Sequence, residues 1–500
     1  MNTIVILCDT LRRDHVSAYT GGKPLNQCWS AEAPEWSVLT PNIDRLAERG
    51  TVFTQCYLGS TPCMPARRDI YTGKYEFLTR GWGSLEEEDV GQDLPSLISQ
   101  AGKVSYLITD HAHLWRRGGE NYHTGYTGFD FVRGTTEDPF HTDPEPDDFT
   151  YPATDSKYME MLPHWSKSIR VRTDELEWPT AAVFDKAITW LEKNHTHEDF
   201  HLHVDCFSPH EPFDPPEDLV KLFDPKGYNV DGWWHGMEYA KWEDRMTPEQ
   251  FNNGRARYAA KVIHIDRWME KLCDTMDRLD LWDDTMLIFT TDHGTFNGDH
   301  GRTGKLQTHQ FDANSHLPFI IAHPGGTGKR CDQLVQLVDI YATTLAAAGC
   351  DVPEGIHGVN LLPLLQDEPL HTRDFAIAGM FGDSVTLTDG DWALHQANRE
   401  ENQPLNWYGK RGSFQLTSRL GDYQNGCRPV SGTARKGPDP TWLSDKNQDP
   451  SELDNLAEEY PEKLKEMQGH LIEKINGLNL PGSCAQEQLE RLELVSQGAG

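Results

Sequence analysis

The sequence of 500 residues lacks paired cysteines, long apolar runs and a basic leader. Its ten cysteines are scattered along the chain, which argues against a disulfide framework and against a zinc ribbon. No run is long enough to cross a membrane, and the apolar stretch at residues 4–8 is too short for a signal peptide. These absences predict a cytoplasmic protein with no membrane partner.

Positive charge is scarce too. Lysine and arginine number 46 against 78 aspartate and glutamate residues, so the formal net charge is −32 and the pI is near 5.0. Proteins that bind a phosphate backbone present basic surfaces, so nucleic acid is not expected as a partner. If the substrate is an anion, the positive field that attracts it must be local.

Internal repeats and low-complexity tracts are absent as well. Hydrophobic residues make up 37% of the chain and include 15 tryptophans among the aromatics, which is enough for the core of a folded globular protein. A chain of this length accommodates one large domain plus a smaller one. Whether the protein forms a homo-oligomer stays open.

Short apolar runs indicate the fold class. Each is typical of a strand buried on both faces of a parallel sheet; they lie at residues 3–8, 104–108, 201–207 and 286–291. Helical patterns at residues 93–101 and 258–279 directly precede two of these runs. The alternation predicts an α/β fold with a large, mostly parallel central sheet flanked by helices.

The pattern changes near residue 370. Short β-like runs there alternate with glycine and aspartate turns, and an amphipathic helix is expected at residues 461–475. We therefore predict a catalytic domain at residues 1–370. A smaller α+β subdomain with an antiparallel sheet and a terminal helix is predicted at residues 371–500.

Polar residues follow four of the apolar runs: Asp9; Asp110, His111 and His113; His210; and Asp292 with His293. The carboxyl ends of parallel strands meet at one edge of a sheet, where open α/β sheets bind ligands. One such residue alone is more often a cap or a turn residue, but four ends together predict a single polar site. Carboxylates together with an imidazole are more typical of a site for a hard divalent cation than of a zinc–thiolate site.

The segment from Ser60 to Tyr75 supplies a nucleophile-type residue. Cys63 stands beside a helix that Pro65 can start and Gly73 can end. Arg67 and Lys74 add two cations, and a helix N-terminus attracts anions. On these residues alone, a buried structural cysteine at an ordinary helix start remains an equal alternative.

The phrase Cys63-x-Pro65-x-Arg67, continued by Thr72-Gly73-Lys74, resembles the signature of the type I sulfatases. In that family the cysteine is converted after translation to formylglycine. Other phrases similar to the family's occur in its order along the chain, at residues 40–47, 209–213, 292–301, 338–345 and 449–456. The resemblance covers essentially the whole chain and implies an alkaline-phosphatase-like fold.

The resemblance also implies a metal centre. Cys63, as formylglycine, would be both nucleophile and metal ligand, and Asp9, Asp292 and His293 would be the other ligands. One divalent ion is implied, with calcium expected and magnesium or manganese as alternatives. The implied maturation partner is a formylglycine-generating enzyme.

Further roles follow from the same resemblance. Arg67 and Lys74 would hold the modified residue, and His113 would assist breakdown of its ester. His210 and Lys305 would contact the substrate sulfate and the leaving group, with His210 as the general acid.

Three departures from the family pattern affect this site. Thr10 stands where many members have a second aspartate, and Asp292 is followed by His293 instead of the common asparagine. The usual Lys-x-x-His phrase is replaced by Asp110-His-Ala-His113. These departures keep a phosphonate monoester hydrolase or phosphodiesterase on the same fold as an alternative.

We therefore expect a sulfatase that acts on an organic sulfate ester, with a carbohydrate as the expected carrier. The carbohydrate expectation rests on irregular loops whose tryptophans could stack on a sugar or could only pin the loops: Trp165, Trp233, Trp234 and Trp242. A non-catalytic sugar or anion binder with an unmodified Cys63 is the alternative from another functional class.

Overall fold

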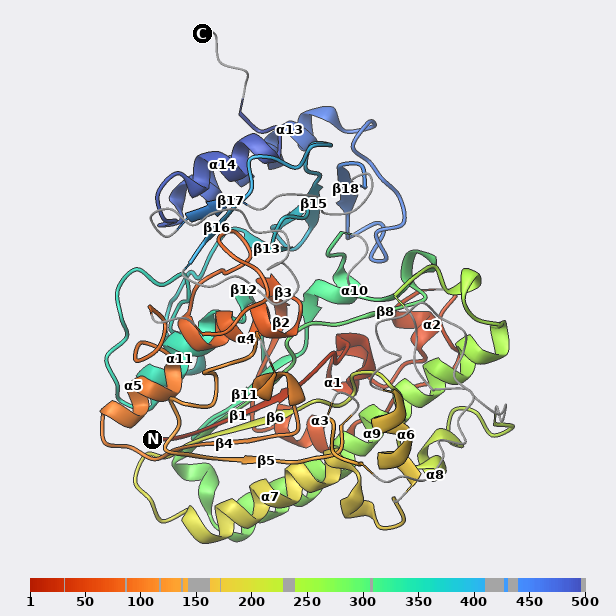
Figure 1. Cartoon of the computed structure of the whole chain (residues 1–500), viewed down its shortest axis with the longest axis vertical. Helices are drawn as coiled ribbons and strands as arrows, with labels where there is room; N and C mark the ends of the chain where they lie inside the picture. Colours follow the sequence, from red (N-terminus) through yellow and green to blue (C-terminus); the bar gives the residue numbers. More distant parts are fainter. Residues whose placement is uncertain are drawn as a thin grey trace.

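Figure 1 shows the computed structural model of the chain. It describes all residues except 31, 86–87, 117, 136–137, 143–161, 171, 228–238, 306–308, 410–426, 430–438 and 496–500. No helix in the described part of the chain is both long and apolar enough to span a bilayer. The cysteines whose side chains are described are free thiols.

A mixed sheet forms the centre of the larger part of the molecule. Within the described residues it has nine strands in the order β10-β2-β11-β7-β1-β6-β4-β5, with β12 paired to β2. These strands are β1 (Asn2–Cys8), β2 (Gly50–Tyr57), β4 (Ser105–Thr109), β5 (Gly128–Phe131), β6 (His201–Cys206), β7 (Thr285–Thr290), β10 (His316–Leu317), β11 (Phe319–Ala322) and β12 (Lys329–Gln336). Only the pairings of β10 and β11 are antiparallel, so the predicted mostly parallel sheet is confirmed.

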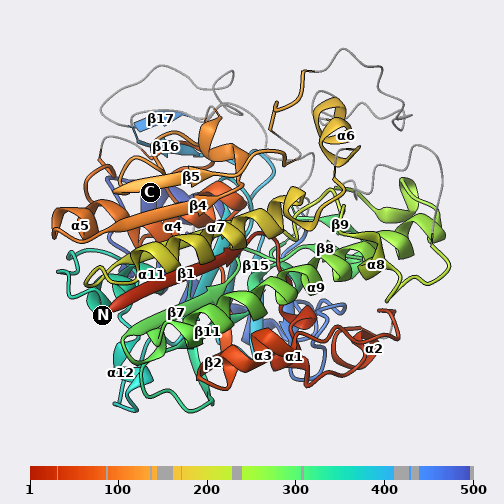
Figure 2. The same ribbon diagram turned by 90° about the horizontal axis from the view of Figure 1, so that it is seen from below.

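Helices cover both faces of this sheet. They include α3 (Pro41–Ala47), α4 (Cys63–Thr72), α5 (Leu94–Gln100), α7 (Pro179–Asn194), α9 (Pro248–Arg278) and α11 (Asp339–Ala347). Figure 2 shows α7 and α9 crossing in front of the strands. Further helices of this part are α6 (Leu162–Arg170) and five single turns: α1 (Ser17–Thr20), α2 (Leu25–Cys28), α8 (Glu217–Val220), α10 (Asp312–Ser315) and α12 (Leu362–Leu365).

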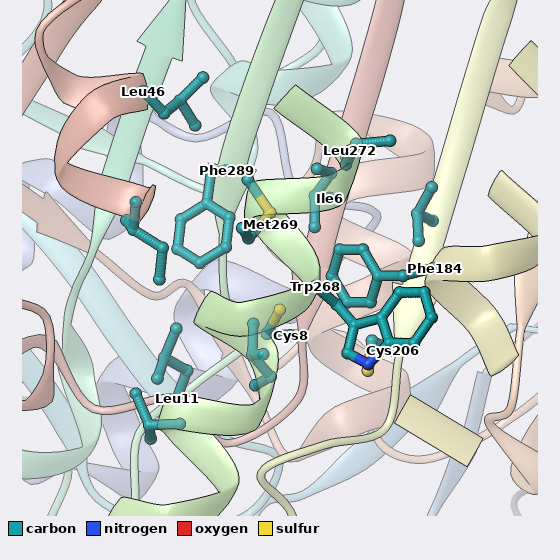
Figure 3. Close-up of a cluster of buried hydrophobic side chains, with 14 of the residues drawn as sticks. Ile6, Cys8, Leu11, Leu46, Phe184, Cys206, Trp268, Met269, Leu272 and Phe289 are labelled. Carbon is teal, nitrogen blue, oxygen red and sulfur yellow. The ribbon is translucent and has the colours of Figure 1, made fainter. Parts of the chain in front are cut away.

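Strand β1 shows why the sheet needs a layer of helices on each face. Its residues alternate between two apolar clusters, because successive side chains of a strand point to opposite faces. Ile6 and Cys8 pack with α3, α7 and α9, as Figure 3 shows with Phe184 and Met269. Val5 and Leu7 pack on the other face, with side chains of α4 and α11.

Two helix ends show how the sequence sets the boundaries. Helix α9 starts at Pro248, ten residues before the predicted start, because Thr247 and Gln250 form a capping box that the apolar pattern alone did not reveal. Helix α4 ends at Gly73, whose φ of 68° is left-handed and favours glycine.

A second sheet lies at the upper end of the molecule in Figure 1, below α13 (Pro461–Gly477) and α14 (Cys484–Arg491). Its order is β18-β15-β14-β13-β3, with bounds β3 (Ser60–Thr61), β13 (Ala376–Met380), β14 (Val385–Thr388), β15 (Trp392–Gln396) and β18 (Trp442–Asp445). Two small pairs are β8 (Phe296–Asn297) with β9 (Thr303–Gly304), and β16 (Asn406–Tyr408) with β17 (Cys427–Pro429). Strand β3 leads directly into α4, so this sheet borders the segment that carries Cys63. The division at residue 370 stays a prediction.

Two buried histidines of β6 make the fold sensitive to acid. Burial lowers the pKa of His201 to about 3 and the pKa of His203 to about 4. An unfolded histidine has a pKa of about 6.5, so the unfolded chain binds these protons first as the pH falls. The stability from neutral rings is therefore complete above about pH 6.5 and is lost towards pH 4 and below.

Replacing one ring tests this acid sensitivity. Between about pH 7.5 and about pH 5, we expect the melting temperature of His203→Gln to fall less than that of the wild type. Over this interval one buried histidine lowers the free energy of unfolding by about 2 kcal/mol. The control is His371→Gln, because the His371 side chain is 67% exposed. Equal losses in all three proteins would contradict the prediction.

Candidate active site

Four strand ends lie side by side. Strands β7, β1, β6 and β4 are neighbours in this order and run parallel. Asp9 and Asp292 therefore stand at adjacent strand ends, and the polar residues after β4 and β6 follow along the same edge. The structure brings together the strand ends that the sequence pattern pointed to.

Four predicted ligands converge at this edge: Asp9, Cys63, Asp292 and His293. One ligand atom from each lies within 4.8 Å of the others, and all four residues are buried. Cys63 is the first residue of α4, so the helix start presents its sulfur towards the strand ends. Within the described residues this is the one cluster that could hold a metal ion.

The tautomer of His293 suits a metal ligand. Its Nδ1 donates to the carbonyl oxygen of Gly294 at 2.8 Å, which leaves the lone pair on Nε2. Nε2 lies 3.3 Å from Sγ of Cys63 and 3.3 Å from Oδ2 of Asp292. Burial, and then the charge of Lys305, lower the pKa of His293 well below its usual value, so the ring is neutral.

The carboxylates also fit a cation. Oδ2 of Asp9 is buried and accepts no hydrogen bond from the described residues, although Nη1 of Arg67 forms an ion pair with it at 3.1 Å. Burial, and then the charge of Asp9, raise the pKa of Asp292 to about 7, because two close carboxylates do not ionise easily together. A divalent cation would remove this repulsion, and two carboxylates with one imidazole are a suitable donor set for it.

The positive charge of Arg67 offsets the charge of the neighbouring carboxylates. Its Nη1 donates to Asp292 at 2.7 Å and lies 3.1 Å from Asp9, and its Nε and Nη2 donate to Asp205 at 2.8 and 2.6 Å. Nη1 also reaches the carbonyl oxygen of Cys63 at 3.2 Å. Arg67 therefore fixes the start of α4 against the ends of three strands, β7, β1 and β6.

Lys305 is the cation that faces Cys63. Its Nζ lies 3.4 Å from Sγ of Cys63 and donates to Oγ1 of Thr10 at 3.0 Å. Burial opposes its charge, but Glu211 and Asp9 among its neighbours raise the pKa of Lys305 above the ordinary lysine value. The side chain is therefore charged beside the candidate nucleophile.

Lys74 does not join this cluster, and the prediction that it holds the modified residue is corrected. Its side chain is exposed beyond Gly73, at the end of α4 opposite to Cys63. Helix α4 has 10 residues, so its two ends are about 15 Å apart. Helical rise alone separates Lys74 from the site.

Thr10 replaces the second aspartate of the family pattern with a hydroxyl. Its Oγ1 donates to Oδ1 of Asp9 at 2.6 Å and accepts from Lys305. Its φ of 70° is unusual for a β-branched residue, and its backbone N–H donates to Oδ1 of Asp292 at 2.9 Å. The backbone and the side chain of Thr10 thus orient both carboxylates.

The predicted histidines lie on the β4 and β6 side of the edge. His210 is 7% exposed, stacks on Phe207 at a centroid distance of 4.2 Å, and donates from Nδ1 to the carbonyl oxygen of Glu211. His113 lies edge-on to Trp82 and bonds through Nδ1 to Nε2 of His111 at 2.8 Å. The sequence analysis placed both histidines at this edge but assigned no role to His111.

Asp205 is a residue that the sequence analysis missed. It lies within β6, buried, and its two oxygens bind Arg67. The available signal was the period of two in β6, which puts His201, His203 and Asp205 on one face of an otherwise apolar strand.

Two of the four loop tryptophans lie in the described part of the chain, and both support the alternative that these rings only pin their loops. Trp165 is fully buried and its Nε1 donates to Asp214 at 3.1 Å, and Trp242 stacks on Phe251 at 4.4 Å. Trp233 and Trp234 lie outside the described residues. The two described rings pin their loops.

A buried cluster of oxygen and nitrogen donors beside a side-chain nucleophile and a lysine is typical of hydrolases that use a divalent cation. A profile of the Sulfatase family matches residues 1–350 of this chain. The chain therefore belongs to the Sulfatase family, as the sequence phrases indicated, and is a sulfuric ester hydrolase.

Relatives and solved structures are similar over nearly the whole chain. Arylsulfatase K of Canis lupus familiaris is 22% identical over 93% of this chain and 83% of its own. A protein solved with its substrate D-glucosamine-2-N,6-O-disulfate has a TM-score of 0.65 and 17% identity over 95% and 97% of the two chains. The phosphonate monoester hydrolase of Agrobacterium radiobacter has a TM-score of 0.64 and 20% identity over 94% and 95%. The predicted alkaline-phosphatase-like fold is confirmed.

Metal binding tests the ligand cluster directly. We expect Asp9→Asn and His293→Gln each to weaken binding of calcium and of manganese by more than about 10-fold, because each removes a ligand. Isothermal titration of metal-stripped protein measures the affinity, and circular dichroism checks the fold. Asp351→Asn, at an exposed carboxylate, is the control. Wild-type affinity in both ligand variants would show that the ion binds elsewhere.

Proposed function

We propose that this sulfatase hydrolyses a sulfate ester carried by a carbohydrate, with formylglycine derived from Cys63 as its nucleophile. The observation that carries the proposal is the position of Sγ of Cys63, 3.3 Å from Nε2 of His293 and 3.4 Å from Nζ of Lys305. A side chain at this point touches both the candidate metal centre and a buried cation.

The thiol itself is a poor candidate for the nucleophile. Cys63 is 2% exposed, and burial together with the charge of Asp9 raises the pKa of its thiol well above the usual value. Reactive cysteines have lowered pKa values and partial exposure. Conversion of this cysteine to formylglycine, whose hydrated aldehyde supplies an oxygen nucleophile, agrees with the family's chemistry and with this surrounding.

The cation would be held by Asp9, Asp292, His293 and the modified residue 63. We propose calcium, because the carboxylates are hard oxygen ligands, with magnesium and manganese as alternatives. When bound, the cation would polarise a sulfate oxygen and favour the ionised nucleophile.

The remaining residues would handle charge and protons. Lys305 would neutralise charge on the sulfate while its S–O bond breaks. His210 would give a proton from Nε2 to the leaving oxygen, which requires the charged imidazolium. Burial lowers the pKa of His210 below its usual value, and the carboxylate of Glu211, 3.3 Å from Nδ1, offsets part of this effect and favours the charged form. The charge of Arg67 would favour the ionised form of the carboxylates, and Arg67 would not touch the substrate.

The carbohydrate part of the proposal rests on the similar protein that was solved with a sulfated glucosamine. Its overall fold aligns with nearly all of this chain, so a saccharide-sized substrate is compatible with the same architecture. Trp165 and Trp242 do not add to this argument, because Trp165 is buried and Trp242 stacks on Phe251.

Parallel assays separate the proposed activity from its closest alternative. We expect an aryl sulfate to be hydrolysed with a higher kcat/KM than an aryl phosphonate or a phosphate diester with the same leaving group. Release of inorganic sulfate from sulfated mono- and disaccharides is then measured. Faster turnover of the phosphorus esters would overturn the sulfatase preference, and release from no saccharide would overturn the carbohydrate assignment.

A pair of lysine variants controls the same assay. Lys305→Ala should lower kcat/KM for the aryl sulfate by about 10²-fold or more, because it removes a charge beside the reacting group. Lys74→Ala should retain nearly full activity, because its side chain is exposed at the opposite end of α4. The reverse result would restore the role that the sequence signature suggested for Lys74.

A further inference from the structure

A cavity of about 280 Å³ lies outside the candidate active site. Its wall is formed by the segment after β1, by β2 and α10, and by the loop at residues 446–452. The described residues that line it include none of those proposed for catalysis or metal binding. Its volume is close to the lower end of the range for small-molecule sites, about 300 Å³. The cavity is therefore large enough for a small ligand of its own.

Arg13 brings to this cavity a positive charge that forms no ion pair with a described acid. Its Nη1 makes no hydrogen bond to the described residues, and its Nη2 makes one long bond, of 3.4 Å, to the carbonyl oxygen of Thr54. Its Nε is buried without a described partner. The guanidinium carbon lies 4.6 Å from the ring centroid of Tyr19, a contact that orients the group without neutralising it. A guanidinium with five N–H donors and so few partners is suited to bind an anion.

Lys446 lies on the same wall of the cavity as Arg13. The carbonyl oxygen of Thr54 bonds to Nη2 of Arg13 and also to Nε2 of His316, the latter at 2.7 Å. The His316 ring stacks on Tyr57 at a centroid distance of 4.6 Å. The hydroxyl oxygen of Tyr57 in turn accepts from Nζ of Lys446 at 2.6 Å. A continuous row of contacts therefore joins the two cations.

Two acids that line the cavity are occupied by Arg12. Its Nε and Nη2 donate to the two oxygens of Asp14, and its Nη1 and Nη2 donate to the two oxygens of Asp299. Asp299 also accepts from Nε1 of Trp29, and the guanidinium of Arg255 lies 5.3 Å from the centroid of that ring. Two cations thus accompany these two acids on this side of the cavity.

The other acids of the cavity do not balance Arg13 either. Asp312 pairs with Nζ of Lys446 at 3.1 Å. Burial, and then the charge of Asp312, raise the pKa of Glu452 to about 8, so this carboxyl group is mostly neutral at pH 7. Asp391 is exposed to solvent, where its charge is screened. Among the described residues of the cavity, the charge of Arg13 is therefore left without a buried counter-charge.

We propose that this cavity binds a small oxyanion, a sulfate or a carboxylate group, with the guanidinium of Arg13 as its anchor. The group is either a free anion or the acidic group of a sugar. Nη1 and Nη2 of Arg13 offer the forked N–H donors that bind two oxygens of such a group, and Lys446 adds a second cation on the same wall. The anion is bound here without a chemical step, apart from the site that carries Cys63.

Calorimetric titration with simple anions tests this site. At pH 7 and constant ionic strength, we expect saturable binding of sodium sulfate or sodium glucuronate, and no binding of glucose. Arg13→Gln should weaken the binding by about 10-fold or more, because it removes charge-assisted hydrogen bonds. Tighter binding of glucuronate would assign the acidic group of a sugar, and tighter binding of sulfate would assign the free anion. Binding of neither anion would overturn the proposal.

A variant of the active site separates the two places where an anion could bind. Lys305→Ala removes the cation beside Cys63. We expect it to retain the class of binding site that Arg13→Gln loses. Binding that disappears in Lys305→Ala and persists in Arg13→Gln would place the anion at the active site and overturn the proposal. The titration needs no turnover, so failure of the proposed function is seen separately, in the aryl sulfate assay.

The matched control is Arg330→Gln. Nη1 of Arg330 also donates to a backbone carbonyl oxygen, that of Ala18 at 3.0 Å, but the side chain is exposed and does not line the cavity. Wild-type affinity is expected for this variant, and a loss equal to that of Arg13→Gln would show a general attraction to surface charge and overturn the site. Circular dichroism checks the fold of each protein, and Arg13→Met replaces Arg13→Gln if the latter does not fold.

Discussion

The guanidinium group of Arg67 lies among three buried carboxylates, and the arrangement of the active edge depends on this contact. It binds Asp205 through two nitrogens and Asp292 through a third, and it lies 3.1 Å from Asp9. Buried carboxylates of this kind would otherwise take up protons or repel one another. The same group also donates to the carbonyl oxygen of Cys63 at the start of α4. Arg67 therefore both positions Cys63 and offsets the negative charge of the strand ends.

A strongly acidic chain nevertheless buries two cations at this point. The net charge is −32, yet Arg67 and Lys305 are both buried beside Cys63. These two cations have different partners. Arg67 is committed to carboxylates, whereas Lys305 reaches Sγ of Cys63 and the hydroxyl of Thr10. Lys305 would therefore offer an anionic ester a buried positive charge in an otherwise acidic protein.

The strands and the ligand cluster could be predicted from the sequence because their signals are local. Apolar runs that end in polar residues marked four strands, and the sheet order placed their ends next to one another. The motif alone did not exclude Lys74 from the site, although the rise of a helix already separates Lys74 from Cys63. The place of Asp205 depends on the register of β4 and β6, in which Thr109 pairs with Asp205, and residue patterns do not specify such a long-range pairing.

The most direct test of this account is the mass of the peptide that contains Cys63, determined for protein produced with and without a formylglycine-generating enzyme. The account predicts that the CH₂–SH side chain is replaced by an aldehyde only in the first preparation, and that sulfate ester turnover rises in proportion to the converted fraction. Full turnover by protein that retains an unmodified thiol at position 63 would contradict it.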